Sequence, residues 1–316
     1  MGRLSKDKRD VYYREAKRQG FRARSAFKLL QIDEELDLLH GVRNVVDLCA
    51  APGGWSQVLA MRIMGAAGDL EAGGRGGDGQ SEPRIVAVDN FEMEPIAGVV
   101  QVQGDITHAS TVQSVLSNFA GERADLVVCD GAPDVTGRSD FDEHVQHQLL
   151  LSALLLATAL LRPGGAFLAK VFRGPRAGEV YARLRQDFRD VACCKPRASR
   201  NSSLEAFVLC RDFLAPRDVG PGGLLYAPAR HEELADLGPG RPAISVPFIA
   251  CGGRDSLDAD TNYPTDKDHQ VLDPVAPPIR APYQEAIQER RTAKRPLVTR
   301  VGTAECDGDG AAPATS

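Results

Sequence analysis

The chain has 316 residues, of which 43% are hydrophobic, and a formal net charge of -5. This length holds one large or two ordinary domains, and the hydrophobic content is normal for a globular protein. A membrane-spanning helix is excluded, because the longest apolar run, residues 149–161, is too short to cross a bilayer. We therefore expect no membrane partner.

The charge is unevenly distributed along the chain. Residues 1–30 contain ten Lys and Arg but only three Asp and Glu, so the remainder is acidic. Between residues 5 and 24, basic side chains alternate with aromatic ones, which suits phosphates and unpaired bases. We predict that residues 1–24 form a basic RNA-binding arm; a merely solvated charged helix is the alternative.

Seven cysteines are present, an odd number, and none forms a CxxC pair. This pattern indicates neither a disulfide framework nor a zinc site, and we expect no metal. The amino terminus lacks the apolar core of a signal peptide. A reducing compartment fits these features, so we expect a cytoplasmic protein.

Strand and helix patterns alternate up to about residue 212, which predicts an α/β domain with a mainly parallel sheet covered on both faces. Residues 25–212 form this domain, interrupted by a flexible glycine-rich insert at 66–84. Helices are predicted at 25–39, 55–64, 110–119, 142–161 and 177–188. Strands are predicted at 45–48, 85–89, 99–103, 125–130, 166–172, 191–195 and 205–210.

The amino-acid composition changes after residue 213. Thirteen of the twenty prolines lie between residues 214 and 316, which argues against a second compact core. We predict a proline-rich extension at 213–300, packed on or near the domain, and a disordered tail at 301–316. Within the extension, a strand is expected at 244–251, an extended run at 274–282 and a short helix at 283–295.

Acids and glycines cluster where the predicted strands end. Gly53 and its neighbour Gly54 turn the first strand into a helix, a geometry typical of nucleotide sites, although ordinary turns have it too. Asp89 ends the second strand, where an acid commonly binds ribose hydroxyls or caps a turn. Asp105 follows the third strand and faces an adenine edge or caps the next helix. Asp130 ends the fourth.

Two lysines fall among apolar residues. Lys170 interrupts the fifth strand, and burying it is unfavourable unless it is paired or neutral, so it is the leading candidate for a functional group. Lys28 lies on the apolar face of the helix at 25–39, and the pattern alone favours a snorkelling side chain. The polar, basic loop at 196–203 suits phosphate contact. Glu205 begins the last predicted strand.

Several long motifs resemble the FtsJ-like RNA ribose 2′-O-methyltransferases, and among them the eukaryotic tRNA anticodon-loop subfamily. They run in order from residue 5 to about 210: SKDKRDVYYR, RARSAFKLLQ, VVDLCAAPGGWSQVL, VQGDIT, ADLVVCDGAPDVTG, PGGAFLAKVFRG and KPRASRNSSLEAF. The resemblance continues more weakly at ISVPFIACGG and PPIRAPYQEA. The chain departs from the family at Gly54, where relatives carry serine, and in its longer insert.

The resemblance implies a class I, Rossmann-like, S-adenosylmethionine-dependent methyltransferase with a doubly wound seven-stranded sheet whose last strand is antiparallel. It also implies that S-adenosylmethionine is the cofactor. Gly53 and Trp55 would line the methionine side, Asp89 the ribose, Asp105 the adenine and Asp130 the pocket floor.

The family's catalytic set corresponds here to Lys28, Asp130, Lys170 and Glu205. The chemistry needs a base for a weakly acidic 2′-hydroxyl, and we assign Lys170 to that role. Burial and nearby positive charge would lower its pKa from near 10.4, whereas the two carboxylates oppose this, so sequence leaves the net direction open. Without the resemblance, a structural cluster of ion pairs is an equal alternative.

The implied substrate is the tRNA anticodon loop at nucleotides 32 and 34. The implied partners are separate helper proteins that select the nucleotide, one a helical-repeat protein and one a β-propeller protein. Competing functions are the same chemistry on rRNA or an mRNA cap, and RNA binding without catalysis. A nicotinamide-dependent oxidoreductase ranks low, because the first turn lacks GxGxxG.

Overall fold

The computed structural model describes residues 10–65, 82–133, 139–215, 244–253 and 255–264, and the single positions 270, 272, 273, 275 and 276. These residues belong to one compact unit that ends at Pro277. Several predictions lie outside the described residues: the first part of the basic arm at 1–9, most of the insert at 66–81, the run at 277–282, the helix at 283–295 and the tail at 301–316.

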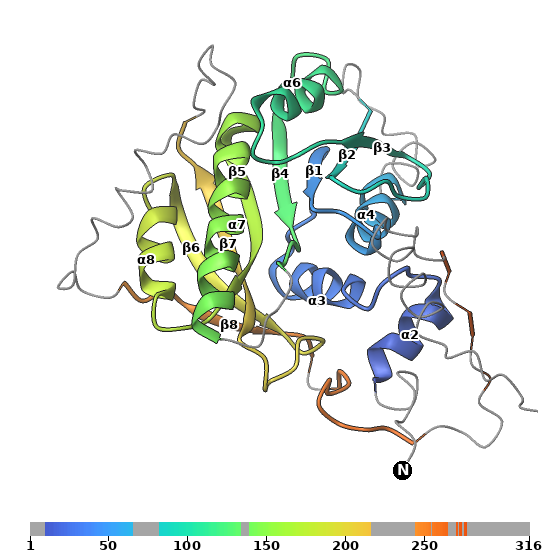
Figure 1. Cartoon of the computed structure of the whole chain (residues 1–316). Coiled ribbons are helices and arrows are strands. Elements are labelled where there is room, and N and C mark those ends of the chain that lie inside the picture. The colour runs from blue at the N-terminus through green and yellow to red at the C-terminus, as the bar shows by residue number, and fades with distance from the viewer. Residues whose placement is uncertain are drawn as a thin grey trace, which may run out of the picture. The chain divides into compact units, whose positions relative to one another are not determined.

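A single eight-stranded sheet has the order β3-β2-β1-β4-β5-β7-β6-β8 (Figure 1). Strands β1 to β5 pair in parallel, whereas β7 is antiparallel to both β5 and β6. The predicted fold, with seven strands and an antiparallel last one, is confirmed, and β8 adds an eighth strand parallel to β6. The strands are β1 Asn44–Leu48, β2 Arg84–Asp89, β3 Val99–Gln103, β4 Ala124–Cys129, β5 Leu161–Phe172, β6 Phe188–Pro196, β7 Glu205–Phe213 and β8 Phe248–Cys251.

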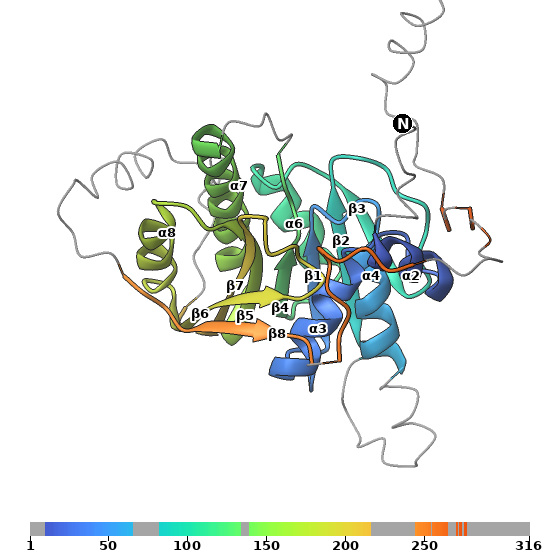
Figure 2. The same ribbon diagram turned by 90° about the horizontal axis from the view of Figure 1, so that it is seen from below.

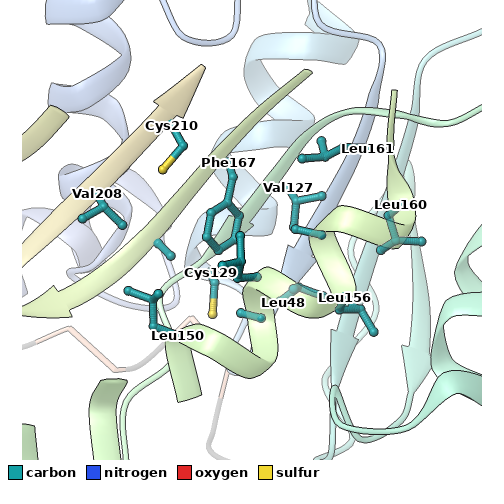
Figure 3. Close-up of a cluster of buried hydrophobic side chains, with 14 of the residues drawn as sticks. Leu48, Val127, Cys129, Leu150, Leu156, Leu160, Leu161, Phe167, Val208 and Cys210 are labelled. Carbon is teal, nitrogen blue, oxygen red and sulfur yellow. The ribbon is translucent and has the colours of Figure 1, made fainter. Parts of the chain in front are cut away.

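Helices cover both faces of the sheet, so its central strands are buried from two sides, whereas the edge strands β3 and β8 are partly exposed (Figure 2). Apolar residues of α3 and α4 pack on one face, and those of α6, α7 and α8 pack on the other. Leu150 and Leu156 of α7, for example, share a buried cluster with Phe167 of β5 (Figure 3). The helices are α2 Val11–Gln19, α3 Ala26–Leu36, α4 Gly54–Leu59, the π-helix η1 Ala60–Met64, α6 Ala109–Ser117, α7 Ser139–Leu160 and α8 Ala177–Leu184.

Among the boundaries that differ from the sequence prediction, two concern the local backbone. The prediction leaves residues 162–165 between the helix at 142–161 and the strand at 166–172, but β5 already begins at Leu161. Its pairing with β4 is irregular between Ala124 and Leu126, opposite the stretch that contains Gly164 with φ +76°. A bulge of this kind lets glycine-rich backbone stay in a strand. The helix predicted at 55–64 divides into α4 and η1.

The strand directions bring the end of β5 and the start of β7 to the same edge of the sheet. Because β7 is antiparallel to β5, it begins where β5 ends, and Glu205 pairs with Phe172 while Phe207 pairs with Lys170. Residues paired across antiparallel strands point to the same face, so Lys170 and Glu205 are diagonal neighbours on one face. This face is the one that α3 and α4 cover, since Phe207 packs in their cluster.

The extension after residue 213 returns to the sheet. The strand predicted at 244–251 is confirmed only for its second half, the four-residue strand β8 at the edge beside β6, and residues 244–247 are not in a strand. After β8 the chain runs past α3 to α2 (Figure 2). Among the described residues, no helix combines the length and apolar character needed to cross a membrane.

Candidate active site

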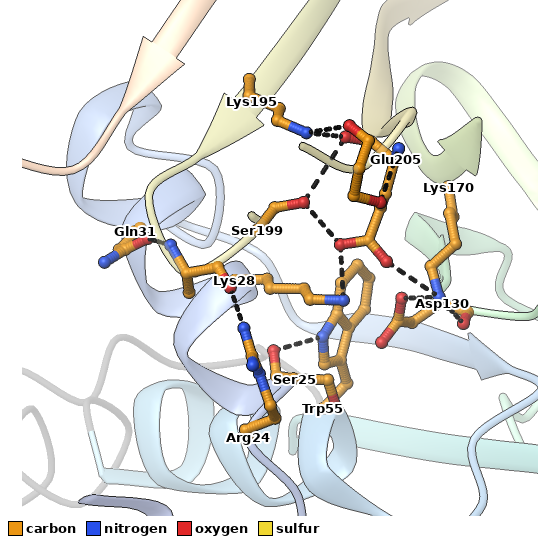
Figure 4. Close-up of polar contacts among 12 residues, drawn as sticks. Arg24, Ser25, Lys28, Gln31, Trp55, Asp130, Lys170, Lys195, Ser199 and Glu205 are labelled. Carbon is orange, nitrogen blue, oxygen red and sulfur yellow. Dashed lines mark hydrogen bonds and ion pairs between the residues drawn. The ribbon is translucent and has the colours of Figure 1, made fainter. Parts of the chain in front are cut away.

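Two lysines and two acids from four separate elements meet at the carboxyl edge of the sheet (Figure 4). The Nζ of Lys170 lies 2.7 Å from Oδ1 of Asp130 and 3.5 Å from Oε2 of Glu205. The Nζ of Lys28 lies 2.7 Å from Oε1 of Glu205. Glu205 therefore bridges the two ammonium groups, and the structure brings together all four residues of the predicted catalytic set.

Lys28 reaches this cluster from the first turn of α3. The indole N–H of Trp55 donates to the carbonyl of Ser25 at 2.9 Å, which fixes the start of the helix against α4. The Lys28 ammonium lies 5.7 Å from the centre of the Phe207 ring, and the lysine is 8% exposed. The snorkelling interpretation of Lys28 is therefore wrong, because the side chain points inward to a carboxylate.

The electrostatics of the cluster favour the charged forms of Glu205 and Lys170. Burial alone would raise the pKa of Glu205, but attraction to Lys28 and Lys170, with hydrogen bonds from Lys28 and Ser199, lowers it to about 2. Burial likewise lowers the pKa of Lys170, but Asp130 and Glu205 outweigh it and the net pKa is raised above its ordinary value. In the protein without ligands, Lys170 is thus an ammonium at neutral pH.

Two polar side chains that the sequence reasoning missed hold Glu205 and its strand in place. Ser199 Oγ donates to Oε1 of Glu205 at 2.7 Å, and Lys195 Nζ donates to the Glu205 carbonyl. Ser199 lies in the loop at 196–203, which the sequence assigned to phosphate contact, and Lys195 lies at the end of the preceding predicted strand. The sequence showed only that this stretch is polar, and it did not indicate that Glu205 is the partner of these two side chains.

Gln146 was also missed, although it stands out as a polar residue inside the apolar helix α7. It is 1% exposed, and its amide donates to the carbonyls of Gly131 and Lys170, each at 3.1 Å. These bonds tie the turn after β4 to β5. They fix the backbone that carries Asp130 relative to the backbone that carries Lys170.

A buried acid lies below the glycine turn. Asp47 in β1 is 1% exposed and accepts a hydrogen bond from Ser56 Oγ at 2.6 Å. Burial is the main cause that raises its pKa to about 7, and the charges of Asp130 and Asp89 raise it too. The hydrogen bond from Ser56 lowers the pKa, but by less. With this pKa the carboxyl group is about half protonated at pH 7, which was not predicted from the sequence.

The residues predicted to bind a cofactor lie around the same edge. Asp89 ends β2, and its carboxylate accepts from the backbone N–H groups of Ala51 at 2.9 Å and Phe91 at 2.8 Å. Gly53 has φ +105°, and a Cβ there would lie only 2.8 Å from Cδ1 of Ile96. The missing side chain at Gly53 therefore makes room for a neighbouring loop.

Asp105 forms a local turn rather than a direct cap of α6. Its Oδ1 accepts from the hydroxyl and backbone N–H of Thr107, and these bonds lower its pKa. The N-cap position of α6 is His108. Trp55, predicted on the methionine side, is 2% exposed, and its ring centre lies 5.4 Å from that of Phe207 with the two rings tilted. Contact of either residue with a cofactor stays a prediction.

Part of the basic arm has an internal role. Arg24 pairs with Asp10 and donates to the carbonyl of Ala198. Arg22 donates to the carbonyls of Glu94 at 2.7 Å and Pro95 at 2.8 Å, which ties it to the loop near Gly53. These guanidinium groups organise the backbone around the site, whatever further contacts they make.

Comparisons with known proteins identify the family of the chain. A family model described as FtsJ-like methyltransferase matches residues 21–213. The tRNA (cytidine(32)/guanosine(34)-2'-O)-methyltransferase of Homo sapiens is 50% identical over 299 residues, covering 92% of this chain and 86% of the human protein. The protein of the same name from Schizosaccharomyces pombe is 49% identical over 290 residues, covering 91% of this chain and 97% of its own.

A solved structure is also similar. The chain resembles a crystal structure of a ribosomal RNA methyltransferase from Plasmodium falciparum with a TM-score of 0.52 and 23% identity. The match covers 62% of this chain and 100% of the other. At this identity the similarity concerns the fold alone.

The shared carboxylate of Glu205 yields a stability prediction. Glu205→Gln keeps the side-chain shape but leaves Lys28 and Lys170 with one remaining carboxylate, that of Asp130. Removing one partner from a buried pair leaves an uncompensated charge, so the free energy of unfolding should fall by roughly 3 kcal/mol. Urea unfolding at pH 7 measures it.

The matched control is Glu15→Gln. Glu15 pairs with Arg18, whose side chain is 75% exposed, so this change should lower the free energy of unfolding by less than about 0.5 kcal/mol. Equal losses in the two variants would contradict the claim that Glu205 neutralises buried charge.

Proposed function

The chain belongs to the FtsJ-like methyltransferase family, and we propose that it methylates the ribose 2′-hydroxyls of nucleotides 32 and 34 in the tRNA anticodon loop. Relatives about half identical over nine-tenths of the chain are named for this activity, so the chain is an enzyme. The observation that carries the proposal is the convergence of Lys28, Glu205, Lys170 and Asp130 beside the glycine turn.

The residues at this edge suit S-adenosylmethionine as cofactor. Each oxygen of Asp89 accepts one backbone N–H group and keeps a further lone pair for a ribose diol. Asp105 would lie at the adenine, Gly53 and Trp55 along the methionine side, and Asp130 at the pocket floor. When bound, the cofactor supplies a methyl group that its sulfonium already activates.

The proposed role of Lys170 is general base. Its neutral amine would take the proton of the 2′-hydroxyl as an oxygen lone pair forms the new bond to the methyl carbon, while the carbon–sulfur bond would break and leave its electron pair on sulfur. Asp130, 2.7 Å away, would orient the Lys170 amine, and Glu205 would hold Lys28 and Lys170 at a fixed separation. A positioned base contributes ~10²–10⁴-fold, and alignment of the reacting atoms supplies much of the rest.

The raised pKa of Lys170 gives this role a requirement. An ammonium accepts no proton, so the amine must first lose its own. Positive charge placed near a lysine lowers its pKa, and a sulfonium brings such a charge. Lys28 already lies on the other side of Glu205 and acts in the same direction. Activity that depends on neutral Lys170 therefore increases as pH rises.

A base role for Lys170 predicts the outcome of Lys170→Arg. Arginine keeps the positive charge but is not deprotonated in proteins, so methyl transfer should fall ~10²–10⁴-fold. In the wild type, transfer should increase about tenfold per pH unit below the pKa of the base. Single-turnover transfer of a radiolabelled methyl group to tRNA, with calorimetry to verify unchanged cofactor binding, measures both. Wild-type rates in the arginine variant would remove Lys170 as the base.

The ribose assignment of Asp89 predicts a loss of cofactor affinity. A hydrogen bond to a charged group contributes about 1.5–3 kcal/mol, so Asp89→Ala should weaken binding of S-adenosylmethionine at least about tenfold. Glu92→Ala is the matched control, because Glu92 is an exposed acid on the following loop and the charge change is the same. Calorimetry giving equal dissociation constants for the two variants would refute the assignment.

The proposed substrate is tRNA, and we place the activity in the cytoplasm. By family resemblance, a helical-repeat helper protein would direct one nucleotide and a β-propeller helper protein the other. The competing functions are methylation of rRNA or an mRNA cap, and RNA binding without catalysis. The three methylation hypotheses predict different sites of modification and the non-catalytic hypothesis predicts none, so a single mapping experiment separates them.

Mapping of 2′-O-methyl groups in total RNA tests the proposed function. Cells without the protein should lose methylation at tRNA positions 32 and 34, the wild-type gene should restore it, and Lys170→Arg should not. Loss at an rRNA or cap position instead would select the rival substrates. An unchanged methylation map would leave only the non-catalytic hypothesis.

A further inference from the structure

A cavity of about 870 Å³ lies beside the catalytic cluster. Lys28 and Glu205 line it, so the cavity reaches the proposed reacting groups. Tyr13 of α2 and Arg200 of the loop after β6 line it too. Tyr13 offers an aromatic ring, with the Lys17 ammonium 4.7 Å from its centre, and the Arg200 side chain is 51% exposed. Such groups suit the base and phosphate of an unstacked nucleotide.

Part of the cavity wall comes from beyond the methyltransferase domain. Ala259, Asp260 and Asn262 line the cavity, although the family match ends at residue 213. The sequence motifs gave no function to this stretch. It follows β8 in the chain, within the extension predicted to pack on the domain.

This wall segment, residues 255–264, is attached to the domain at several points. Tyr12 OH of α2 donates to the Leu257 carbonyl at 2.6 Å, and Arg197 Nη1 donates to the Ser256 carbonyl at 3.1 Å. Ala259 is 4% exposed and packs in the same cluster as α3. The segment is therefore built into the rim of the cavity.

Asp260 connects the wall segment to the opposite rim. Its Oδ2 accepts from the backbone N–H of Asn201 at 2.6 Å, and its Oδ1 accepts from Ser202 Oγ at 3.2 Å. The same loop carries Ser199, which donates to Glu205, and Arg200. One carboxylate thus spans from the extension to the loop that holds the catalytic glutamate.

We propose that the wall segment shapes the pocket for the acceptor nucleotide, a nucleotide of single-stranded RNA, and that Asp260 is a positioning residue that fixes the 199–203 loop over it. This inference rests on the proposed function for the identity of the nucleotide. A pocket completed by the extension accepts RNA only when the segment is in place, so the extension helps to determine which RNA is methylated.

The test measures RNA binding and methyl transfer separately. Asp260→Ala removes both bonds to the loop, and Asn262→Trp fills part of the cavity. Each should weaken binding of a tRNA anticodon stem-loop about tenfold by fluorescence anisotropy, raise KM for tRNA, and leave the dissociation constant for S-adenosylmethionine unchanged. Asp260→Asn keeps one oxygen acceptor and should give an intermediate loss.

Asp255→Ala is the matched control. Asp255 is an exposed acid of the same segment that does not line the cavity, so the charge change is equal and RNA binding should match the wild type. Thermal unfolding verifies that all variants are folded.

The outcomes separate this inference from the proposed function. If Asp260→Ala and Asn262→Trp bind RNA as the wild type does, or if Asp255→Ala loses as much affinity as they do, the inference is overturned, whatever the activity. If the wild type binds the stem-loop but transfers no methyl group to tRNA, the proposed function fails. In that case, a loss of RNA affinity in Asp260→Ala and Asn262→Trp alone would still support the role of the wall segment in RNA binding.

Discussion

The carboxylate of Glu205 between two buried ammonium groups is the interaction on which the rest of the site depends. Lysines are rarely buried without a partner, and here one acid serves two of them, with Asp130 as the second counter-charge. The four side chains come from α3, from the turn after β4, from β5 and from β7. Only a sheet in which an antiparallel strand begins beside the end of β5 brings them together, so the topology and the charge pairing require each other.

The residues around the four-residue cluster mainly fix the positions of its backbone and side chains, and most of them carry no charge. Gln146 ties the turn after β4 to β5, and Ser199 holds the Glu205 carboxylate. Trp55 ties α4 to the start of α3. Each of these bonds involves a backbone carbonyl or a member of the cluster itself. A proton transfer needs its donor and acceptor within hydrogen-bond reach, and rigid neighbours provide that separation.

How much the sequence could predict follows from what each signal measures. Apolar periodicity located nearly every strand and helix, and it marked Lys170, because a charge inside a strand of buried residues contradicts the pattern. It gave the wrong interpretation of Lys28, because periodicity shows which face of a helix is buried but not that Glu205 of a distant strand lies opposite that lysine. The start of β5 at Leu161 was missed because a bulge keeps Gly164 within the strand. The partners of Ser199 and Gln146 are tertiary contacts, which no local pattern contains.

The raised pKa of Lys170 gives the arrangement a chemical consequence. Two carboxylates that hold a lysine in place also stabilise its ammonium form, and so oppose its use as a base. A site with only one of them would have a better base at neutral pH but a less well oriented one. The pairing resolves this conflict if positive charge arrives together with the substrates, because that charge lowers the pKa while the geometry stays fixed. The buried amine is then reactive only in the assembled complex, and the cluster in the free protein is its stable resting form.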